Sequence, residues 1–356
     1  MKILIPLAVN FGKHGGFRVL SKLADNWLAL GHDVEFLVHV SSPKPYFPTN
    51  AKIRYYDLTG KILENNKSLV GNLSLGVFGL RYALRKALEK EWADVVLATQ
   101  NFSVDPIYLS GIGGKKFYYI QAYEPEFYNQ GPFWYKLYKN IAVNSYKRNF
   151  IKIVNSNMYK SYKEIQTDKV VFPGLDLKNF YPRKSIIKKE PMIVGTIGRT
   201  EEWKGTKYIL QAFRLLKEKY ADKIILNCAF GDLDWAKQDK IQMVFPKNDS
   251  QLADYYRTLD VYVCAGTIQL DAVHYPVIES MACNIPIVTT GYYPANEENA
   301  YIIPTKNAEA IAEAISKIYE NYSRATDKAD IAYQQVEEFE WKNVAQRMLN
   351  YFKSND

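Results

Sequence analysis

Apolar runs of strand length alternate with amphipathic stretches along the first half of the chain. Runs rich in Val, Ile and Tyr predict strands over residues 2–7, 34–40, 94–99, 116–121 and 151–155. Between them, the helical spacing of apolar residues predicts helices over residues 16–30 and 78–91, and Gly31 ends the first of these. Strands that alternate with helices in this way are typical of a doubly wound parallel sheet.

The second half repeats the same pattern. Strands are predicted over residues 192–197, 223–229, 242–245, 260–264 and 286–290, and helices over residues 204–220, 249–258 and 276–283. Residues 172–184, which are dense in turn formers and charge, separate the halves. A chain of 356 residues also exceeds the size at which one hydrophobic core usually stops growing. We therefore expect two α/β domains, residues 1–178 and residues 179–338.

The charge of the chain is divided unevenly between these halves. Up to Lys178 there are 24 Lys and Arg against 14 Asp and Glu, whereas the remainder has 22 against 24, so the first half carries the whole net charge of +8. Aromatic and basic residues interleave over residues 133–150, which suits an anionic membrane surface or an acidic acceptor. A solvated helix whose aromatic rings pack inward is the alternative. No zinc-finger, RNP-type or GXXG motif accompanies the charge, so we expect no nucleic-acid partner.

Cysteine usage and the amino-terminal segment indicate the compartment. Cys228, Cys264 and Cys283 are odd in number and far apart, which supports neither a disulfide framework nor a zinc site. A reducing cytosol fits this pattern. The first residues lack a signal-peptide cleavage pattern, and no apolar stretch approaches the ~20 residues that cross a bilayer. We expect a cytoplasmic protein, with peripheral contact at the inner face of the membrane through the basic first half.

The segment of residues 270–290 holds two carboxylates around an expected helix start. Asp271 and Glu279 are eight positions apart, and Pro276 suits the first helical position because its missing N–H would be unsatisfied there anyway. Free amides at a helix start attract phosphate, and carboxylates accept hydrogen bonds from sugar or ribose hydroxyls. With Glu279 in the first turn, the segment indicates a site for a hydroxyl-rich, phosphorylated ligand. An amphipathic core helix with two solvated acids is the alternative.

Two further loops after predicted strands carry groups that bind phosphate. Ligands of an open α/β sheet bind outside the carboxyl ends of its strands. After the first strand, Gly15 and Gly16 lead into a helix, and glycine lets backbone amides approach a phosphate closely; a tight turn explains the pair equally well. After the first strand of the second half, Arg199 and Lys204 flank an acidic turn, and two such cations neutralise a diphosphate without a metal.

Together these motifs resemble the family-four glycosyltransferases of the GT-B fold. The matching motifs are Gly198-Arg199 with Lys204-Gly205, the acid-x(7)-Glu segment that opens the apolar helix, and the turn of residues 171–176. They occur in the family's order over nearly the whole chain. The resemblance implies two doubly wound Rossmann-like domains that face a central cleft. It also implies a C-terminal helix, residues 339–356, that crosses back onto the N-terminal domain.

The resemblance also implies a role for each matching residue. Arg199 and Lys204, beside Gly198, would hold the donor diphosphate, Glu279 the ribose hydroxyls, and Asp271 would lie near the transferred sugar. The remaining donor-binding positions that it implies are Ala272, Val273 and His274 for the sugar and distal phosphate, Gly15 and Gly16 for the diphosphate, and Val244 and Phe245 for the nucleobase. No metal or other cofactor is implied.

Several positions depart from the family's pattern. Asp271 replaces the usual glutamate, and its shorter side chain withdraws the carboxylate by roughly 1 Å. His274 stands where the family often has glycine. Two roles are expected for it: its side chain contacts the sugar or phosphate, or it only fills space. On the acceptor side, Gln121 takes the position of a histidine. Residues expected to bind acceptor or sugar there are His14, Gln121, Tyr123 and Glu124, although the aromatic rings of this segment would also suit a core.

The expected activity is retaining, metal-independent transfer of a sugar from a UDP-, dTDP- or GDP-sugar to a saccharide or lipid-linked glycan. The segment around Gln121 resembles family members that assemble bacterial surface polysaccharides. Two alternatives remain: a GT-B sugar-nucleotide epimerase, and a catalytically silent partner that binds sugar nucleotides for another transferase. A nicotinamide dehydrogenase is disfavoured because the Gly15-Gly16 loop lacks the G-x-G-x-x-G fingerprint.

Overall fold

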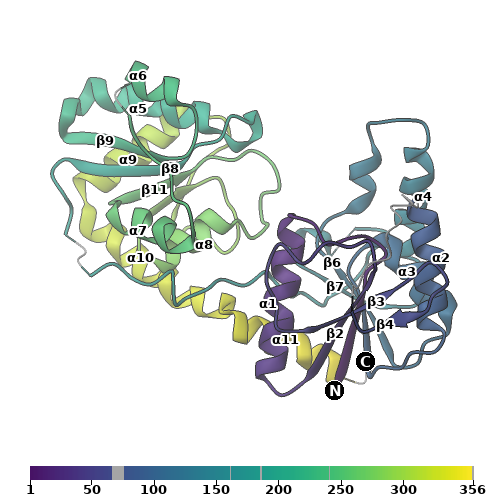
Figure 1. Cartoon of the computed structure of the whole chain (residues 1–356). Helices are drawn as coiled ribbons and strands as arrows, with labels where there is room; N and C mark the ends of the chain where they lie inside the picture. Colours follow the sequence, from purple (N-terminus) through teal and green to yellow (C-terminus); the bar gives the residue numbers. More distant parts are fainter. Residues whose placement is uncertain (66–75, 161, 185–186, 240, 355–356) are drawn as a thin grey trace. The chain divides into compact units, whose positions relative to one another are not determined.

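The computed structural model describes residues 1–65, 76–160, 162–184, 187–239 and 241–354. Its chain forms two compact units (Figure 1). Unit 1 comprises Met1–Pro173 and Trp341–Asp356, and unit 2 comprises Gly174–Glu340. Across the described residues, no helix combines the length and the apolar character that a membrane crossing requires.

Unit 1 is built on a seven-stranded sheet in the order β4-β3-β2-β1-β5-β6-β7. Its strands are β1 (Lys2–Pro6), β2 (Asp33–His39), β3 (Lys52–Tyr56), β4 (Ile62–Leu63), β5 (Val95–Ala98), β6 (Lys115–Ile120) and β7 (Ile151–Val154). All neighbours pair in parallel except β3 and β4. The five predicted strands of the first half correspond to β1, β2, β5, β6 and β7, whereas β3 and β4 were not predicted.

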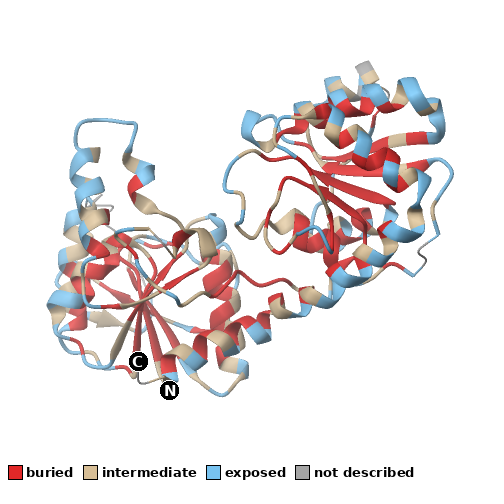
Figure 2. Cartoon of the chain, turned by 180° about the vertical axis from the view of Figure 1, so that it is seen from behind, coloured by how far each residue is buried: buried red, intermediate tan, exposed pale blue. Residues whose placement is uncertain are grey.

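Helices cover both faces of this sheet, which explains why its strands appear in the sequence as continuous apolar runs. The α-helices of unit 1 are α1 (Gly15–Ala29), α2 (Val77–Leu88), α3 (Asn101–Ser110), α4 (Tyr135–Ser145) and α11 (Trp341–Lys353), with short 3-10 turns η1 (Glu124–Tyr128) and η2 (Asn157–Tyr159). Ile3 and Ile5 of β1 lie in one core cluster, and Leu4 between them lies in the other. Because successive side chains of a strand point to opposite faces, a strand covered on both sides is apolar throughout. Figure 2 shows the strands of this sheet as largely buried.

The C-terminal helix α11 returns to unit 1, as the expected fold implied. Trp27 of α1 donates its indole N–H to the carbonyl oxygen of Ala345 over 3.1 Å, and its ring lies 5.5 Å from that of Phe352. Both residues of α11 belong to the buried core of unit 1. The helix begins at Trp341 rather than at residue 339, and residues 355–356 of the predicted range lie outside the described residues.

Unit 2 is built on a parallel six-stranded sheet in the order β10-β9-β8-β11-β12-β13. Its strands are β8 (Met192–Ile197), β9 (Ile224–Ala229), β10 (Gln242–Val244), β11 (Val261–Cys264), β12 (Ile287–Thr289) and β13 (Tyr301–Ile302). Its helices are α5 (Thr206–Tyr220), α6 (Leu233–Asp239), α7 (Asp249–Thr258), α8 (Tyr275–Ala282), α9 (Ala308–Glu320) and α10 (Tyr322–Val336), with 3-10 turns η3 (Glu202–Lys204), η4 (Ala221–Lys223) and η5 (Glu337–Phe339). The expected fold class is confirmed.

The chain passes between the units at Pro173 and again at Glu340, whereas the sequence prediction placed the first boundary at Lys178. Residues after Pro173 already pack on unit 2. The Leu175 N–H donates to the Phe339 carbonyl over 2.6 Å, and the Phe180 ring lies 6.3 Å from that of Tyr256 in α7. These contacts explain why the division precedes Lys178.

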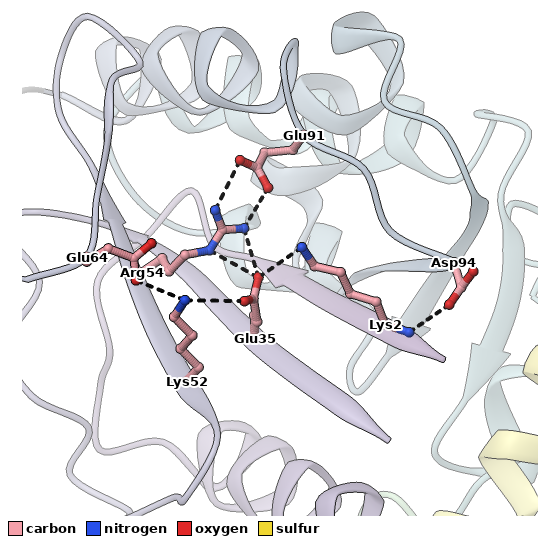
Figure 3. A network of polar contacts seen from close by, with 7 residues as sticks. All are labelled: Lys2, Glu35, Lys52, Arg54, Glu64, Glu91 and Asp94. Atoms are coloured by element: carbon pink, nitrogen blue, oxygen red, sulfur yellow. Dashed lines mark hydrogen bonds and ion pairs between the residues drawn. The ribbon is translucent and has the colours of Figure 1, made fainter. Parts of the chain in front are cut away.

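A buried ion network joins the first strands of unit 1 (Figure 3). Arg54 of β3 lies 2.8 Å from a Glu35 carboxylate oxygen on β2 and donates to both Glu91 oxygens, at 3.0 and 2.6 Å. The hydrogen bonds to Glu91 are the largest cause that raises the pKa of Arg54. Lys2 and Lys52 add ion pairs to Glu35 at 3.4 and 3.8 Å. Because each buried charge has a partner, the network holds β1, β2 and β3 in register.

Candidate functional site

The loop after β8 is fixed tightly against its neighbours. The Gly198 N–H donates to the Ala229 carbonyl over 2.8 Å, and the Arg199 N–H donates to the Thr206 hydroxyl over 3.1 Å at the start of α5. Gly205 has a φ of +74°, and a Cβ there would lie 1.8 Å from the Ala265 carbonyl oxygen. Only glycine fits this approach, so the loop carrying Arg199 and η3 is held against the end of β11.

The loop after β11 is anchored to the same region. The Thr267 N–H donates to the carbonyl of Trp203 in η3 over 2.8 Å, and the Tyr292 hydroxyl donates to the Ile268 carbonyl over 3.0 Å. These bonds join three loops that follow β8, β11 and β12. The structure thus brings together the loops of Arg199, Lys204 and Asp271, as their positions after parallel strands predicted.

Asp271 has an unusual backbone in this loop. Its φ is +69°, and its N–H donates to the Gly291 carbonyl over 3.0 Å. Aspartate tolerates the left-handed region better than most residues, because its short polar side chain can bond locally. The side chain is exposed, so its carboxylate remains accessible to a ligand.

His274 packs between a thiol and an aromatic ring. Its Nδ1 lies 3.5 Å from Cys264 Sγ, and its ring stacks on Tyr292 with centroids 4.5 Å apart and planes at 21°. Burial, and then the charges of Lys204 and Arg199, lower the pKa of His274 to about 3. The imidazole is therefore neutral at pH 7 although two predicted site cations lie near it.

The neighbouring thiol occupies one nitrogen of this imidazole. Burial raises the pKa of Cys264 to about 11, so its thiol keeps the proton at neutral pH. Cys264 Sγ and Nδ1 of His274 share a hydrogen bond over 3.5 Å, so both neighbours are uncharged at pH 7. The arrangement places a neutral imidazole near Lys204 and Arg199.

His274 gives a testable pH dependence of stability. Well above pH 6.5 the imidazole is neutral in both the folded and the unfolded chain, so protonation of His274 does not lower the free energy of unfolding. As pH falls from 6.5 toward 3, the unfolded chain binds a proton that the folded chain does not, and the free energy of unfolding decreases. By pH 4 we expect a loss of about 3 kcal/mol from this group, absent in His274→Gln. Urea unfolding at pH 7.5 and pH 4 checks this, and parallel losses in both proteins would contradict it.

The predicted position of Glu279 in the first helical turn is wrong. Helix α8 begins at Tyr275, because His274 keeps an extended backbone, and Glu279 is consequently in the second turn. Its carboxylate is buried and accepts a hydrogen bond from the Tyr256 hydroxyl of α7 over 3.0 Å. The start of α8 is one residue earlier than the position of Pro276 indicated.

The end of β10 carries the two residues expected near the nucleobase. Val244 accepts a hydrogen bond from the Phe230 N–H over 2.8 Å, and Phe245 is half-exposed. Both line a cavity of about 510 Å³ that also borders α7. Asn227 lines the same cavity, and its Oδ1 is a buried acceptor without a partner among the described residues. This cavity has apolar walls and, in Asn227, a polar side chain with one unbonded acceptor.

In unit 1, predicted residues from two strand ends lie together. Gly15 and Gly16 open α1, and His14 precedes them as its N-cap residue without a side-chain capping bond. The Gln121 side-chain amide donates to the Gly16 carbonyl over 3.5 Å, and a Cβ on Gly16 would lie 3.2 Å from Gln121 Nε2. The Gln121 carbonyl accepts from the Asn155 side chain over 2.9 Å.

Glu124 holds several elements of unit 1 together. Its carboxylate accepts the Asn101 N–H at the start of α3, at 2.9 and 3.1 Å, and the Tyr118 hydroxyl. Its own N–H donates to the Tyr146 hydroxyl over 3.2 Å, and the Tyr123 ring stacks on the Tyr146 ring at 5.9 Å. Burial raises the pKa of Glu124 to about 7. Tyr123 and Glu124 thus anchor η1.

Sequence reasoning missed the partners of these predicted residues. Tyr256, Cys264 and Tyr292 surround Glu279 and His274, and Tyr146 and Asn101 hold Glu124. A signal existed for Tyr292, because it follows a predicted strand and so lies at the same sheet edge as Asp271. Nothing in the local pattern distinguishes the others from core aromatic or small residues.

Comparisons with known proteins are consistent with this geometry. Residues 178–335 match the family described as glycosyl transferases group 1. Spore coat protein SA of Bacillus subtilis is 29% identical over 52% of this chain, and the chain spans 59% of that protein. A Haemophilus influenzae protein described as an uncharacterized glycosyltransferase is 21% identical over 97% of this chain and 100% of its own length. The structure of Anabaena HepE in complex with UDP and glucose has a TM-score of 0.68, 15% identity, and coverage of 99% and 100% of the two chains.

The structural likeness extends over both units, and the family match lies within unit 2. The chain therefore has the GT-B fold, and its residues 178–335 match the domain of the glycosyl transferases group 1 family.

Proposed function

We propose that the protein moves a sugar, with retention at the anomeric carbon and without a metal ion, from a nucleotide-diphosphate sugar to a saccharide or lipid-linked glycan. The observation that carries this proposal is the grouping of Arg199 and Lys204 near the neutral His274 in loops at one sheet edge. This group offers two cations and one neutral imidazole. Such a set matches a diphosphate, which gains negative charge as it leaves.

In the proposed reaction, the bond between the anomeric carbon and the diphosphate oxygen breaks. The acceptor hydroxyl oxygen bonds the same face of that carbon, and its proton passes to the departing diphosphate. Arg199 and Lys204 stabilise the developing charge, and the neutral His274 imidazole contacts a phosphate or sugar oxygen. Because the loop that carries Arg199 and Lys204 is held in place before the reaction, little reorganisation is needed when charge appears.

The remaining residues fix the donor. Glu279 accepts hydrogen bonds from the ribose hydroxyls, Asp271 lies beside the transferred sugar, and the amides of residues 272–274 contact its phosphate. The nucleobase lies at the end of β10 against Val244 and Phe245, which line the cavity together with Asn227. The HepE structures are complexes with UDP, with UDP and glucose, and with UDP-glucose, which makes UDP-sugars the first donors to test.

For unit 1 we propose the acceptor side and backbone amides that suit a phosphate group. Gly15 and Gly16 offer backbone amides at the start of α1, next to the Gln121 side chain. Gln121 and His14 bind the acceptor hydroxyl or the sugar. Glu124 has a different role, because its hydrogen bonds to the start of α3 and to Tyr146 hold the neighbouring Tyr123 in position. The excess of basic residues in this unit draws it to an anionic membrane, where lipid-linked acceptors are anchored.

A panel of UDP-, dTDP- and GDP-sugars, each with and without glycan acceptors, tests the proposed activity. We expect nucleoside diphosphate release that requires an acceptor, a new glycosidic bond, and unchanged rates in EDTA. An epimerised donor without acceptor use would favour an epimerase, and tight binding without turnover would favour a silent binding partner. Loss of activity in EDTA, restored by a divalent cation, would contradict the metal-independent mechanism.

A further inference from the structure

An aromatic hairpin projects from unit 1 between β6 and β7. It consists of η1, the loop that follows, and α4 (Figure 1). Its inner side is an aromatic cluster: the Tyr128 ring lies 5.7 Å from both Tyr135 and Tyr138, and Tyr138 lies 5.5 Å from Phe102 of α3. These contacts give the hairpin a fixed shape of its own.

The outer side of the hairpin exposes large apolar side chains. Phe133 is 82% exposed, Phe127 is 62% exposed, and Trp134 and Leu137 are each 49% exposed. Trp134 and Leu137 are three positions apart in sequence at the start of α4, which places them on one side of the helix. We call these four residues the aromatic patch. Figure 2 shows the hairpin as largely exposed.

Helix α2 adds exposed aromatic side chains next to the inner cluster of the hairpin. Phe78 is half-exposed, and its ring lies 6.1 Å from that of Tyr138. Tyr82 follows one turn later on α2 and is 59% exposed. Exposed apolar groups that gather in this way mark an interaction surface, whereas single exposed apolar residues do not.

The hairpin carries Glu124 and Glu126 in η1, but all its charged residues after η1 are basic. From Phe127 to Phe150 the chain has no Asp or Glu, but it has Lys136, Lys139, Lys147 and Arg148. Arg148 is paired with Asp105 at 2.8 Å, whereas Lys136 and Lys139 are exposed beside the patch on α4. Aromatic rings flanked by exposed lysines suit the interface of an anionic bilayer, where rings enter the headgroup region and lysines contact lipid phosphates.

We infer that the aromatic patch, flanked by Lys136 and Lys139, docks the protein on an anionic lipid surface. The inference builds on the membrane contact proposed above and names the surface that makes it. The patch inserts Phe133 and Trp134 among the lipid headgroups, and the lysines supply the salt-sensitive attraction. Docking there holds unit 1 at the surface in which a lipid-linked acceptor is anchored.

Cosedimentation with vesicles tests this inference. The whole chain is mixed with phosphatidylcholine vesicles that contain or lack phosphatidylglycerol, at low and high salt. We expect salt-sensitive binding to the anionic vesicles only. Replacing Phe133 and Trp134 together with serine should weaken it at least about tenfold, because the apolar area that enters the interface is lost. Lys136→Gln with Lys139→Gln should weaken it by a similar factor and reduce its salt dependence.

A matched control uses exposed apolar residues of unit 2. Ile331 and Tyr333 on α10 are 39% and 40% exposed, and their joint replacement with serine should leave vesicle binding unchanged. All variants should transfer sugar to a soluble acceptor at the wild-type rate, which separates this inference from the proposed activity. Equal vesicle binding by the Phe133/Trp134 variant and wild type would overturn the inference. So would wild-type binding that ignores lipid charge, or self-association without vesicles that the same variant abolishes.

Discussion

Replacing Lys204 with alanine is expected to lower turnover of the nucleotide sugar at least about 100-fold, the loss typical of removing one fixed donor to a developing oxyanion. The backbone of Lys204 donates to the Glu201 carbonyl over 3.0 Å, and alanine preserves that bond. The fold should therefore remain, and circular dichroism and thermal unfolding should match wild type. Steady-state kinetics at saturating donor measures the effect on kcat.

Lys207 provides the matched control for this variant. It lies near Lys204 at the start of α5, has the same charge, and forms an exposed ion pair with Glu202. Because exposed ion pairs contribute little to stability and Lys207 has no proposed role in catalysis, Lys207→Ala should keep kcat within about twofold. A Lys204→Ala enzyme as active as Lys207→Ala would remove Lys204 from the phosphate site.

Replacing Gly205 with alanine should destabilise the protein by about 3 kcal/mol, because the new Cβ meets a backbone atom that cannot move away cheaply. That Cβ would lie 1.8 Å from the Ala265 carbonyl oxygen, and the φ of +74° adds its own strain. The displaced loops carry Lys204 and Asp271, so turnover should fall as well. Denaturant unfolding measures the stability change.

The substitution Gly291→Ala separates the effect of backbone strain from the effect of the steric clash. The φ of Gly291 is +99°, but a Cβ there meets nothing within 4 Å, so Gly291→Ala has backbone strain without the clash. We expect it to cost about 1–2 kcal/mol. Equal destabilisation by both substitutions would show that the close approach of Gly205 to Ala265 contributes nothing.

The periodicity of apolar residues predicted most of the two sheets, because their central strands are buried on both faces. It failed where that periodicity is weak. β3 has only five residues, and two of them, Lys52 and Arg54, are charged, so its sequence does not resemble an apolar strand. The ion pairs of Arg54 with Glu35 and Glu91 compensate this charge, but they cannot be read from the local sequence. α3 contains Pro106 and has apolar residues around most of its circumference, so no amphipathic stripe indicates a helix.

The part of the candidate site that follows from the order of the strands was predictable from the sequence. Residues after parallel strands meet at one sheet edge, which predicted that the Arg199 loop lies near the Asp271 loop and accounts for the proximity of Gly16 to Gln121. The neutral state of His274 was not predictable, because it depends on the burial of the ring and on the charges of Lys204 and Arg199, which are distant in sequence. The turn occupied by Glu279 depended on the backbone of one residue, His274.

The most direct test of the central claim follows a ¹³C-labelled sugar from its UDP donor to a glycan acceptor by NMR, with wild type and Lys204→Ala side by side in EDTA. We predict that wild type forms a glycoside whose anomeric configuration equals that of the donor. We also predict that nucleotide release requires the acceptor and that the variant is at least about 100-fold slower. An inverted glycoside would contradict the retaining mechanism. Absence of any glycoside with the full set of UDP-, dTDP- and GDP-sugars and glycan acceptors would contradict the proposed activity itself.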